Sequence, residues 1–417
     1  MTEIQIKQGW QEVKLGDIAA VTSSKRIFAS DYVDNGIPFF RSKEIINLSN
    51  GDNIATELFI TDQKYAEIKD RFGVPMKGDI LITSVGTLGV LYQVNCGDFY
   101  FKDGNLIWIK DFKNKTDSKF LLYALKSNKN QEKLKGQAIG SSQKAFTIDL
   151  IKNFEITLPP LPIQNKIAEI LGNYDDLIEA NNRRIKILET QAAKIYTEWF
   201  VHYRYPGHEN VPLVDSGTDF GMIPQGWEVR KVGDIAQVVT GKTPSTARTD
   251  YYNGNILFIK TPDMHGDMFV IETTQTLSEA GEQVQKNKTL PTNSIVVSCI
   301  GTVGVVAITS SPSQTNQQIN SIVPKEITDY CYLYFVAKNL KQHLENLGSN
   351  GATMGNVNKS KFESIEILYA DKNIRSDFFN LVSSSFHQIL NLQQQNQNLK
   401  KSRDLLIPQL VGGLLEV

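Results

Sequence analysis

Four short segments of the chain place lysine or arginine beside serine or threonine. Guanidinium and ammonium groups position phosphates, and together with hydroxyls and amides they read base edges. One such residue alone is usually a solvated surface group. Here, however, the segment at Lys25 matches the segment at Lys242, and the segment at Arg41 matches the one at Lys260. We therefore predict DNA contacts from Lys25, Arg26, Arg41, Lys43, Lys242, Thr243, Ser245, Lys260 and Thr261.

Residues that could carry catalysis lack the partners that catalysis needs. Gly241, Lys242 and Thr243 look like the end of a phosphate-binding loop, but the motif needs an earlier glycine where Ala236 stands, and Pro244 follows directly. An ATPase built on this loop is therefore a disfavoured alternative. The five histidines show neither an HExxH pattern nor metal-ligand spacing. The sequence predicts no catalytic residue and no metal site.

The four segments belong to an internal repeat of about half the chain length. Gly9-Trp10 followed by LGDIA recurs as Gly226-Trp227 followed by VGDIA, and ITSVGTLG at 82–89 recurs as VSCIGTVG at 297–304. Several blocks in the same order predict a duplicated unit. Short β-branched runs between turn residues predict mixed α/β structure in each copy, hence an α+β chain. A pseudo-twofold arrangement is the natural geometry for two alike copies.

The glycine pairs in 86–89 and 301–304 allow two interpretations. The favoured one is a tight turn after a buried strand, and the other is a cradle for an anion. Helical spacing of apolar residues further predicts packing helices over about 118–134 and 328–347.

Each copy ends in a long predicted helix, at 163–200 and 374–407, with apolar residues in steps of three and four. Neither helix can bury such a stripe alone, so we expect the two to pair antiparallel within the chain; pairing between two chains is the alternative. Pro408 should end or kink the second helix. Polar Asn181 and Asn396 fall on the seam, where they fix the register. The predicted seam comprises Ile167, Ile170, Tyr174, Ile178, Asn181, Leu188, Ile195, Trp199, Phe378, Leu381, Ile389, Leu392, Asn396, Leu399, Leu406 and Leu410.

Composition excludes several classes of protein. Forty-four basic and 45 acidic residues give a net charge of −1, so any nucleic-acid contact must rest on local patches or on a basic partner. Three widely spaced cysteines without a CxxC pattern exclude a disulfide scaffold and fit a reducing cytoplasm. The first residues, MTEIQIKQGW, show no apolar signal segment, and no apolar run is long enough for a membrane helix.

Several segments resemble the specificity subunit of type I restriction–modification systems, and the resemblance covers essentially the whole chain. LPPLPIQ at 158–164 opens the first long helix, and WFV at 199–201 with RYPGH at 204–208 closes it. RDLLIPQL at 403–410 closes the second helix, and PQGW at 224–227 followed by GDI looks like the opening of a recognition domain. The second helix lacks the Pro-Pro-Leu opening, and the first copy has Ser-Ser-Lys where the second has Gly-Lys-Thr-Pro-Ser.

The resemblance implies two target-recognition domains, at 1–158 and 206–370, each reading one half of a split site in double-stranded DNA. It implies two antiparallel spacer helices, at 159–205 and 371–417, which dock two modification subunits. Those partners would bind S-adenosylmethionine, and restriction subunits would hydrolyse ATP, so no cofactor is expected in this chain. The alternative is a non-catalytic coiled-coil adaptor with two ligand-binding modules, which the neutral charge mildly favours.

Overall fold

The computed structural model describes residues 9–51, 56–113, 116–140, 144–348 and 356–417. The chain forms two compact units: the first comprises Met1–Glu179 and Asn398–Val417, and the second comprises Ala180–Gln397. The two long helices, α7 (Leu161–Tyr196) and α13 (Lys372–Val411), each contribute one part to either unit.

The first unit contains two four-stranded sheets, ordered β2-β9-β6-β7 and β3-β5-β4-β8. All pairs are antiparallel except β4 with β8. Strands β1 and β10 form a separate antiparallel pair. The strands are β1 (Gln11–Lys14), β2 (Ala20–Thr22), β3 (Tyr32–Val33), β4 (Ile37–Phe40), β5 (Phe59–Ile60), β6 (Ile80–Thr83), β7 (Leu91–Gln93), β8 (Tyr100–Phe101), β9 (Leu106–Lys110) and β10 (Glu155–Leu158). The shorter helices are α1 (Leu15–Ile18), α2 (Ser42–Asn50), α3 (Asp62–Phe72), α4 (Ser118–Lys126), α5 (Asn128–Gly136) and α6 (Ile148–Lys152).

The second unit repeats this topology with a five-stranded sheet, β14-β21-β18-β19-β16, and a three-stranded sheet, β17-β15-β20. Strand β15 runs parallel to β20, as β4 does to β8. The strands are β11 (Leu213–Asp215), β12 (Met222–Pro224), β13 (Glu228–Lys231), β14 (Ala236–Thr240), β15 (Tyr252–Ile259), β16 (Phe269–Val270), β17 (Thr276–Leu277), β18 (Ile295–Ser298), β19 (Val306–Thr309), β20 (Ser313–Thr315), β21 (Ile319–Pro324) and β22 (Glu366–Tyr369). The helices are α8 (Val232–Ile235), α9 (Glu279–Gln283), α10 (Tyr330–Asn339), α11 (Lys341–Gly348) and α12 (Lys359–Glu363).

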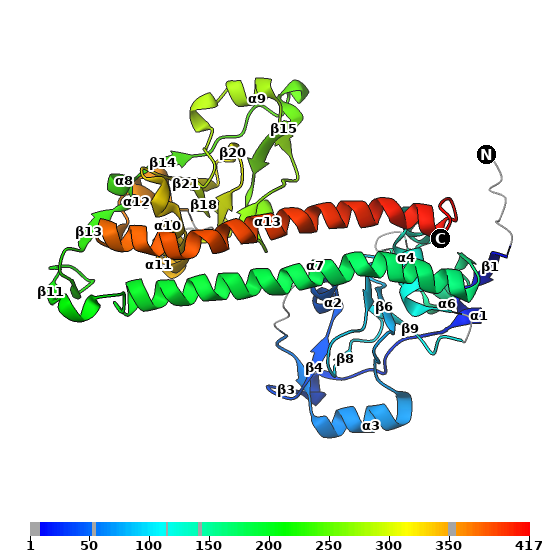
Figure 1. Cartoon of the computed structure of the whole chain (residues 1–417). Helices are drawn as coiled ribbons and strands as arrows, with labels where there is room; N and C mark the ends of the chain where they lie inside the picture. The colour runs from blue at the N-terminus through cyan, green and yellow to red at the C-terminus, as the bar shows by residue number, and fades with distance from the viewer. Residues whose placement is uncertain (1–8, 52–55, 114–115, 141–143, 349–355) are drawn as a thin grey trace. The chain divides into compact units, whose positions relative to one another are not determined.

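The shared strand order confirms the duplication inferred from the sequence. Strand β6 (ILIT) lies at the centre of the first sheet and β18 (IVVS) at the centre of its counterpart, and every residue of both strands is buried. Outer strands β1 and β10 pair antiparallel in the first unit, as β13 and β22 do in the second. The α+β class is therefore correct (Figure 1).

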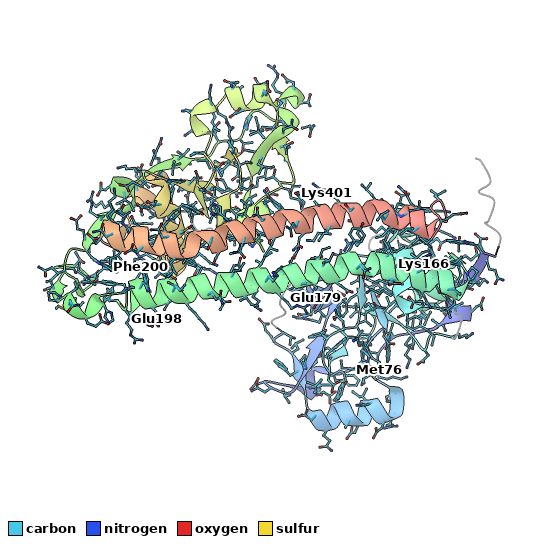
Figure 2. The ribbon with its side chains drawn as sticks, viewed as in Figure 1. Met76, Lys166, Glu179, Glu198, Phe200 and Lys401 are labelled. Carbon is cyan, nitrogen blue, oxygen red and sulfur yellow. The ribbon has the colours of Figure 1, made fainter. Side chains whose placement is uncertain are left out.

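Helices α7 and α13 pair antiparallel in the second unit. The Asn181 side-chain amide donates to the Asn396 carbonyl oxygen at 2.9 Å, and the Asn396 amide donates to Asn182 at 2.7 Å. Directly after α7, a π-helical turn at Thr197–Val201 carries Phe200, which is labelled in Figure 2. The Phe200 ring lies 5.0 Å from that of Phe378, near the start of α13. Rising residue numbers on α7 thus meet falling numbers on α13, as the predicted antiparallel pair requires.

The same direction holds in the first unit. Arg403 of α13 forms an ion pair with Asp175 of α7, and the Tyr123 hydroxyl of α4 donates to the same carboxylate at 2.6 Å. Toward the start of α7, Ile167 shares a buried core with Leu410 at the end of α13. The second unit has a similar polar group, in which Arg375 of α13 pairs with Asp329 and the Tyr369 hydroxyl donates to the same carboxylate at 2.7 Å.

Most predicted seam residues are buried or partly buried, and one prediction is wrong. Leu381 is 50% exposed, whereas its neighbours Phe378 and Val382 are fully buried. Phe378 of α13 contacts the rings of Trp199 and Phe200 in and around the π-helical turn, and also the ring of Phe335 in α10. The buried face of α13 therefore packs against α10 as well as α7. Ile185 and Ala192, which also follow the apolar spacing of the first long helix, are buried, and the buried residues that the seam pattern missed are Tyr196, Val382 and Phe386.

Two predicted helix boundaries also differ. Pro408 does not end α13, which continues to Val411, because a proline in the last turn removes only one backbone donor. The predicted helix over 118–134 is two helices, since Ser127 caps the second by accepting from the Asn130 amide at 3.4 Å. The counterpart likewise divides at Leu340 into α10 and α11. The four-part division at 158, 205 and 370 stays a prediction. In the part of the chain that the structure describes, no helix has the length and apolar character needed to cross a bilayer.

Candidate nucleic-acid interface

Three backbone hydrogen bonds gather the loops of the first unit around the turn between β8 and β9. The Lys102 amide donates to the Phe40 carbonyl at 2.9 Å, which ties this turn to the end of β4. The Ser84 amide donates to Asn105 at 2.9 Å, and the Phe146 amide donates to Ser84 at 2.9 Å. The loops that follow β4 and β6 therefore meet the turn between β8 and β9 at one end of the sheets.

The second unit makes the same three bonds with different residues. The Asn316 amide donates to the Ile259 carbonyl at 3.1 Å, which ties the turn between β20 and β21 to the end of β15. The Cys299 amide donates to Gln318 at 2.7 Å, and the Val357 amide donates to Cys299 at 2.9 Å. We call each set of three bonds the loop frame of its unit. The predicted DNA-binding residues follow β2 and β4 in the first unit and β14 and β15 in the second.

The glycine pairs form tight turns within the frames, as the favoured interpretation predicted. Gly86 and Gly89 have φ of 77° and 80°, and Gly301 and Gly304 have φ of 79° and 83°, which is the left-handed region where glycine is unstrained. A hydroxyl supports each turn: Thr83 accepts from the Val90 amide at 3.0 Å, and Ser298 accepts from the Val305 amide at 2.8 Å.

Arg41 and Lys260 occupy the same place, directly after β4 and β15. Each backbone amide donates to a carboxylate three residues later, Arg41 to Glu44 at 2.8 Å and Lys260 to Asp263 at 2.9 Å. The Arg41 guanidinium also pairs with Glu44 at 2.8 Å. Burial alone would raise the pKa of Glu44, but the bonds from Arg41 outweigh burial and hold that pKa below its usual value. The Lys260 ammonium donates to Gln275 at 2.8 Å. The side chains of Arg41 and Lys260 thus each have a hydrogen-bonding partner within the chain.

The loop after β2 carries Lys25 and Arg26, both exposed. The Lys25 amide donates to the Tyr100 hydroxyl at 2.7 Å, and the Lys25 ammonium lies 5.0 Å from the Phe72 ring. Arg26 Nε donates to Asp103 Oδ2 at 3.2 Å. Lys43, in the first turn of α2, is also exposed. These contacts place the first unit's basic residues around the turn of its loop frame.

The loop after β14 carries the second unit's predicted residues. Lys242 and Ser245 are exposed, and the Thr243 hydroxyl donates to Gln317 Oε1 at 2.6 Å. The structure contradicts the DNA contact predicted for Thr261. This residue is only 7% exposed, and its hydroxyl oxygen is buried. It lies inward because the turn that Asp263 caps directs it toward the core.

No phosphate-binding loop follows β14. The next helical element after Gly241 is a single 3-10 turn at Thr249–Tyr251, so the helix N-terminus that such a loop needs is missing there. A β-carbon at Gly241 would lie 2.2 Å from the Asn316 carbonyl oxygen. Glycine is therefore needed at 241 because the loop after β14 passes close to the turn between β20 and β21. Across the described residues, no three His, Cys, Asp or Glu side chains lie together as a metal site.

A cavity of about 770 Å³ lies in the second unit behind the 301–304 turn. Its lining mixes apolar groups with charges of both signs, among them Glu189 of α7 and Lys338 of α10. Burial raises the pKa of Glu189, and the Lys338 charge partly opposes that rise. The lining holds no cysteine or serine nucleophile.

Each of the two units thus carries a loop frame of the same kind. The family model described as the type I restriction modification DNA specificity domain matches the chain twice, at residues 7–190 and 224–399. The chain therefore belongs to the type I restriction–modification DNA specificity family, as the resemblance indicated. Reading a DNA site is the role of this family.

Individual relatives agree with the family match. The type I restriction enzyme HindI specificity subunit of Haemophilus influenzae is 29% identical, over 97% of this chain and 99% of its own length. The MjaIX specificity subunit of Methanocaldococcus jannaschii is 28% identical, over 99% and 95%. The crystal structure of a type I restriction-modification S subunit from M. genitalium has a TM-score of 0.59 at 15% identity, with 98% of each chain covered, and supports the fold.

Proposed function

We propose that this chain is the DNA specificity subunit of a type I restriction–modification enzyme. Each unit reads one half of a bipartite target in double-stranded DNA through the loops of its frame. The observation that carries the proposal is the duplicated loop frame, in which the same three backbone bonds hold polar and basic loops twice in one chain. Two linked readers bind a split site more tightly than either reader alone, because the second contact becomes intramolecular.

The chain itself is proposed to be non-catalytic. Methyl transfer from S-adenosylmethionine belongs to two modification subunits, and ATP hydrolysis and cleavage belong to restriction subunits. Helices α7 and α13 dock the modification subunits and set the spacing between the half-sites. The assembly is proposed to work in the cytoplasm. The net charge of −1 supports weak DNA affinity for the isolated chain, with many phosphate contacts supplied by the partners.

Methylome sequencing tests this proposal. The modification subunits are expressed in a methylation-free host with and without this chain. We expect methylated adenine at one bipartite sequence only when the chain is present. The same methylation in both cultures would contradict a specificity role. Absence of methylation in both, from modification subunits that copurify with the chain, would favour the adaptor alternative.

A further inference from the structure

Asp103 and Gln317 occupy the same place in the two units. Each is the residue directly after the amide that ties its turn to the preceding sheet, Lys102 in the first unit and Asn316 in the second. Both therefore lie at the tip where the loops of the frame meet. The pattern of basic residues in the sequence did not single them out, since one is acidic and the other neutral.

A side chain from the loop after the first strand of the sheet holds each tip residue. In the first unit, Arg26 Nε donates to Asp103 Oδ2 at 3.2 Å. In the second unit, the Thr243 hydroxyl donates to Gln317 Oε1 at 2.6 Å. The two loops are counterparts, following β2 and β14. Different residue types thus build one arrangement twice: a polar acceptor at the tip, oriented by a donor from the neighbouring loop.

Both tip residues keep hydrogen-bonding capacity facing outward. A carboxylate has about four acceptor positions. The bond from Arg26 occupies one of them at Asp103, whose side chain is 23% exposed. Gln317 is exposed, and its bond to Thr243 uses one lone pair of Oε1 while leaving both amide hydrogens.

We infer that Asp103 and Gln317 are the base-reading residues of the two half-sites, with Arg26 and Thr243 as their positioning residues. This inference rests on the proposed function. In the major groove a carboxylate accepts from the amino group of cytosine, and a glutamine amide bonds adenine at two points. Asp103 therefore selects cytosine in the half-site of the first unit, and Gln317 selects adenine in the half-site of the second.

The test uses the full chain assembled with its modification subunits, and methylome sequencing as the readout. Asp103→Asn should relax or change one cytosine position in one half-site and leave the other half-site intact. Gln317→Glu should alter one adenine position in the opposite half-site. The expected loss of discrimination at the altered position is about five- to 150-fold. Asp149→Asn on α6 and Gln342→Glu on α11 are matched controls with the same chemical changes at exposed positions outside the frames.

The positioning role has its own readout. Thr243→Val should relax the same adenine position as Gln317→Glu, and Thr243→Ser, which keeps the hydroxyl, should restore it. A variant that lowers methylation at every site equally, with the sequence unchanged, would show only a structural role and overturn the inference. Tip variants with full methylation of the unaltered sequence would overturn it while leaving the proposed function intact. A wild-type complex without any bipartite sequence would instead refute the proposed function itself.

Discussion

Replacing Phe378 with alanine should test the helix interface of the second unit most sharply. Phe378 is fully buried, and its ring centroid lies 5.0 Å from Phe200, 6.0 Å from Trp199, 6.2 Å from Tyr196 and 6.3 Å from Phe335. Deleting a buried phenylalanine side chain costs about 3–5 kcal/mol. That is a large part of the roughly 5–15 kcal/mol that holds a typical protein folded.

Leu381 provides the matched control on the same helix, three residues away. Because it is 50% exposed, Leu381→Ala should change stability by no more than about 0.5 kcal/mol. Amide hydrogen exchange of peptides from residues 372–397 reports on the second unit alone. Since about 1.4 kcal/mol corresponds to a tenfold change, Phe378→Ala should speed exchange of the most protected amides by roughly 10²- to 10³-fold or more. Equal acceleration by both variants would refute the interface described here.

Four further predictions follow from individual contacts. Asn396→Leu should destabilise the second unit by about 1–3 kcal/mol in urea unfolding, since it leaves the buried Asn181 amide without its acceptor; a cost near zero would contradict this. Removing one heptad from both α7 and α13 should change the spacer in the methylated sequence or abolish methylation, and an unchanged spacer would argue against helices that set the spacing. Burial raises the pKa of Tyr65 to about 12 from 10.0, so its contribution to stability is complete below pH 10 and is lost as pH rises through about 12; Tyr65→Phe should flatten the alkaline end of the stability curve, and an unchanged curve would contradict the burial. Iodoacetamide should modify exposed Cys96 in the native protein, whereas Cys299 and Cys331, whose pKa values burial raises to about 11 and 12, should react only after unfolding; mass spectrometry distinguishes the three.

Features with a strong period or a repeat were predictable from the sequence. The duplication, both long helices and their antiparallel pairing follow from blocks that recur in order and from apolar steps of three and four. Asn181 and Asn396 were expected on the seam, and they bond each other there. Such features depend on patterns spread over many residues, so one atypical residue does not hide them.

Features decided by a single tertiary contact were not predictable. Leu381 has the right spacing for the seam, but the π-helical turn of α7 and the rings of α10 move the buried face to Phe378 and Val382. Thr261 stands beside a lysine in a matched loop, yet the Asp263 cap turns it inward. The place of Asp103 and Gln317 depends on backbone bonds between segments far apart in the sequence, and residue type alone does not reveal it.

Binding of the chain, assembled with its modification subunits, to defined DNA duplexes tests the central claim most directly. The duplexes carry both half-sites at the native spacing, both half-sites with the spacing changed, or one half-site alone. We predict tight binding only to the first duplex, and at least tenfold weaker binding when either half-site is missing or the spacing is altered. Equal affinity for a single half-site and for the complete site would contradict a chain that reads two half-sites with two alike units.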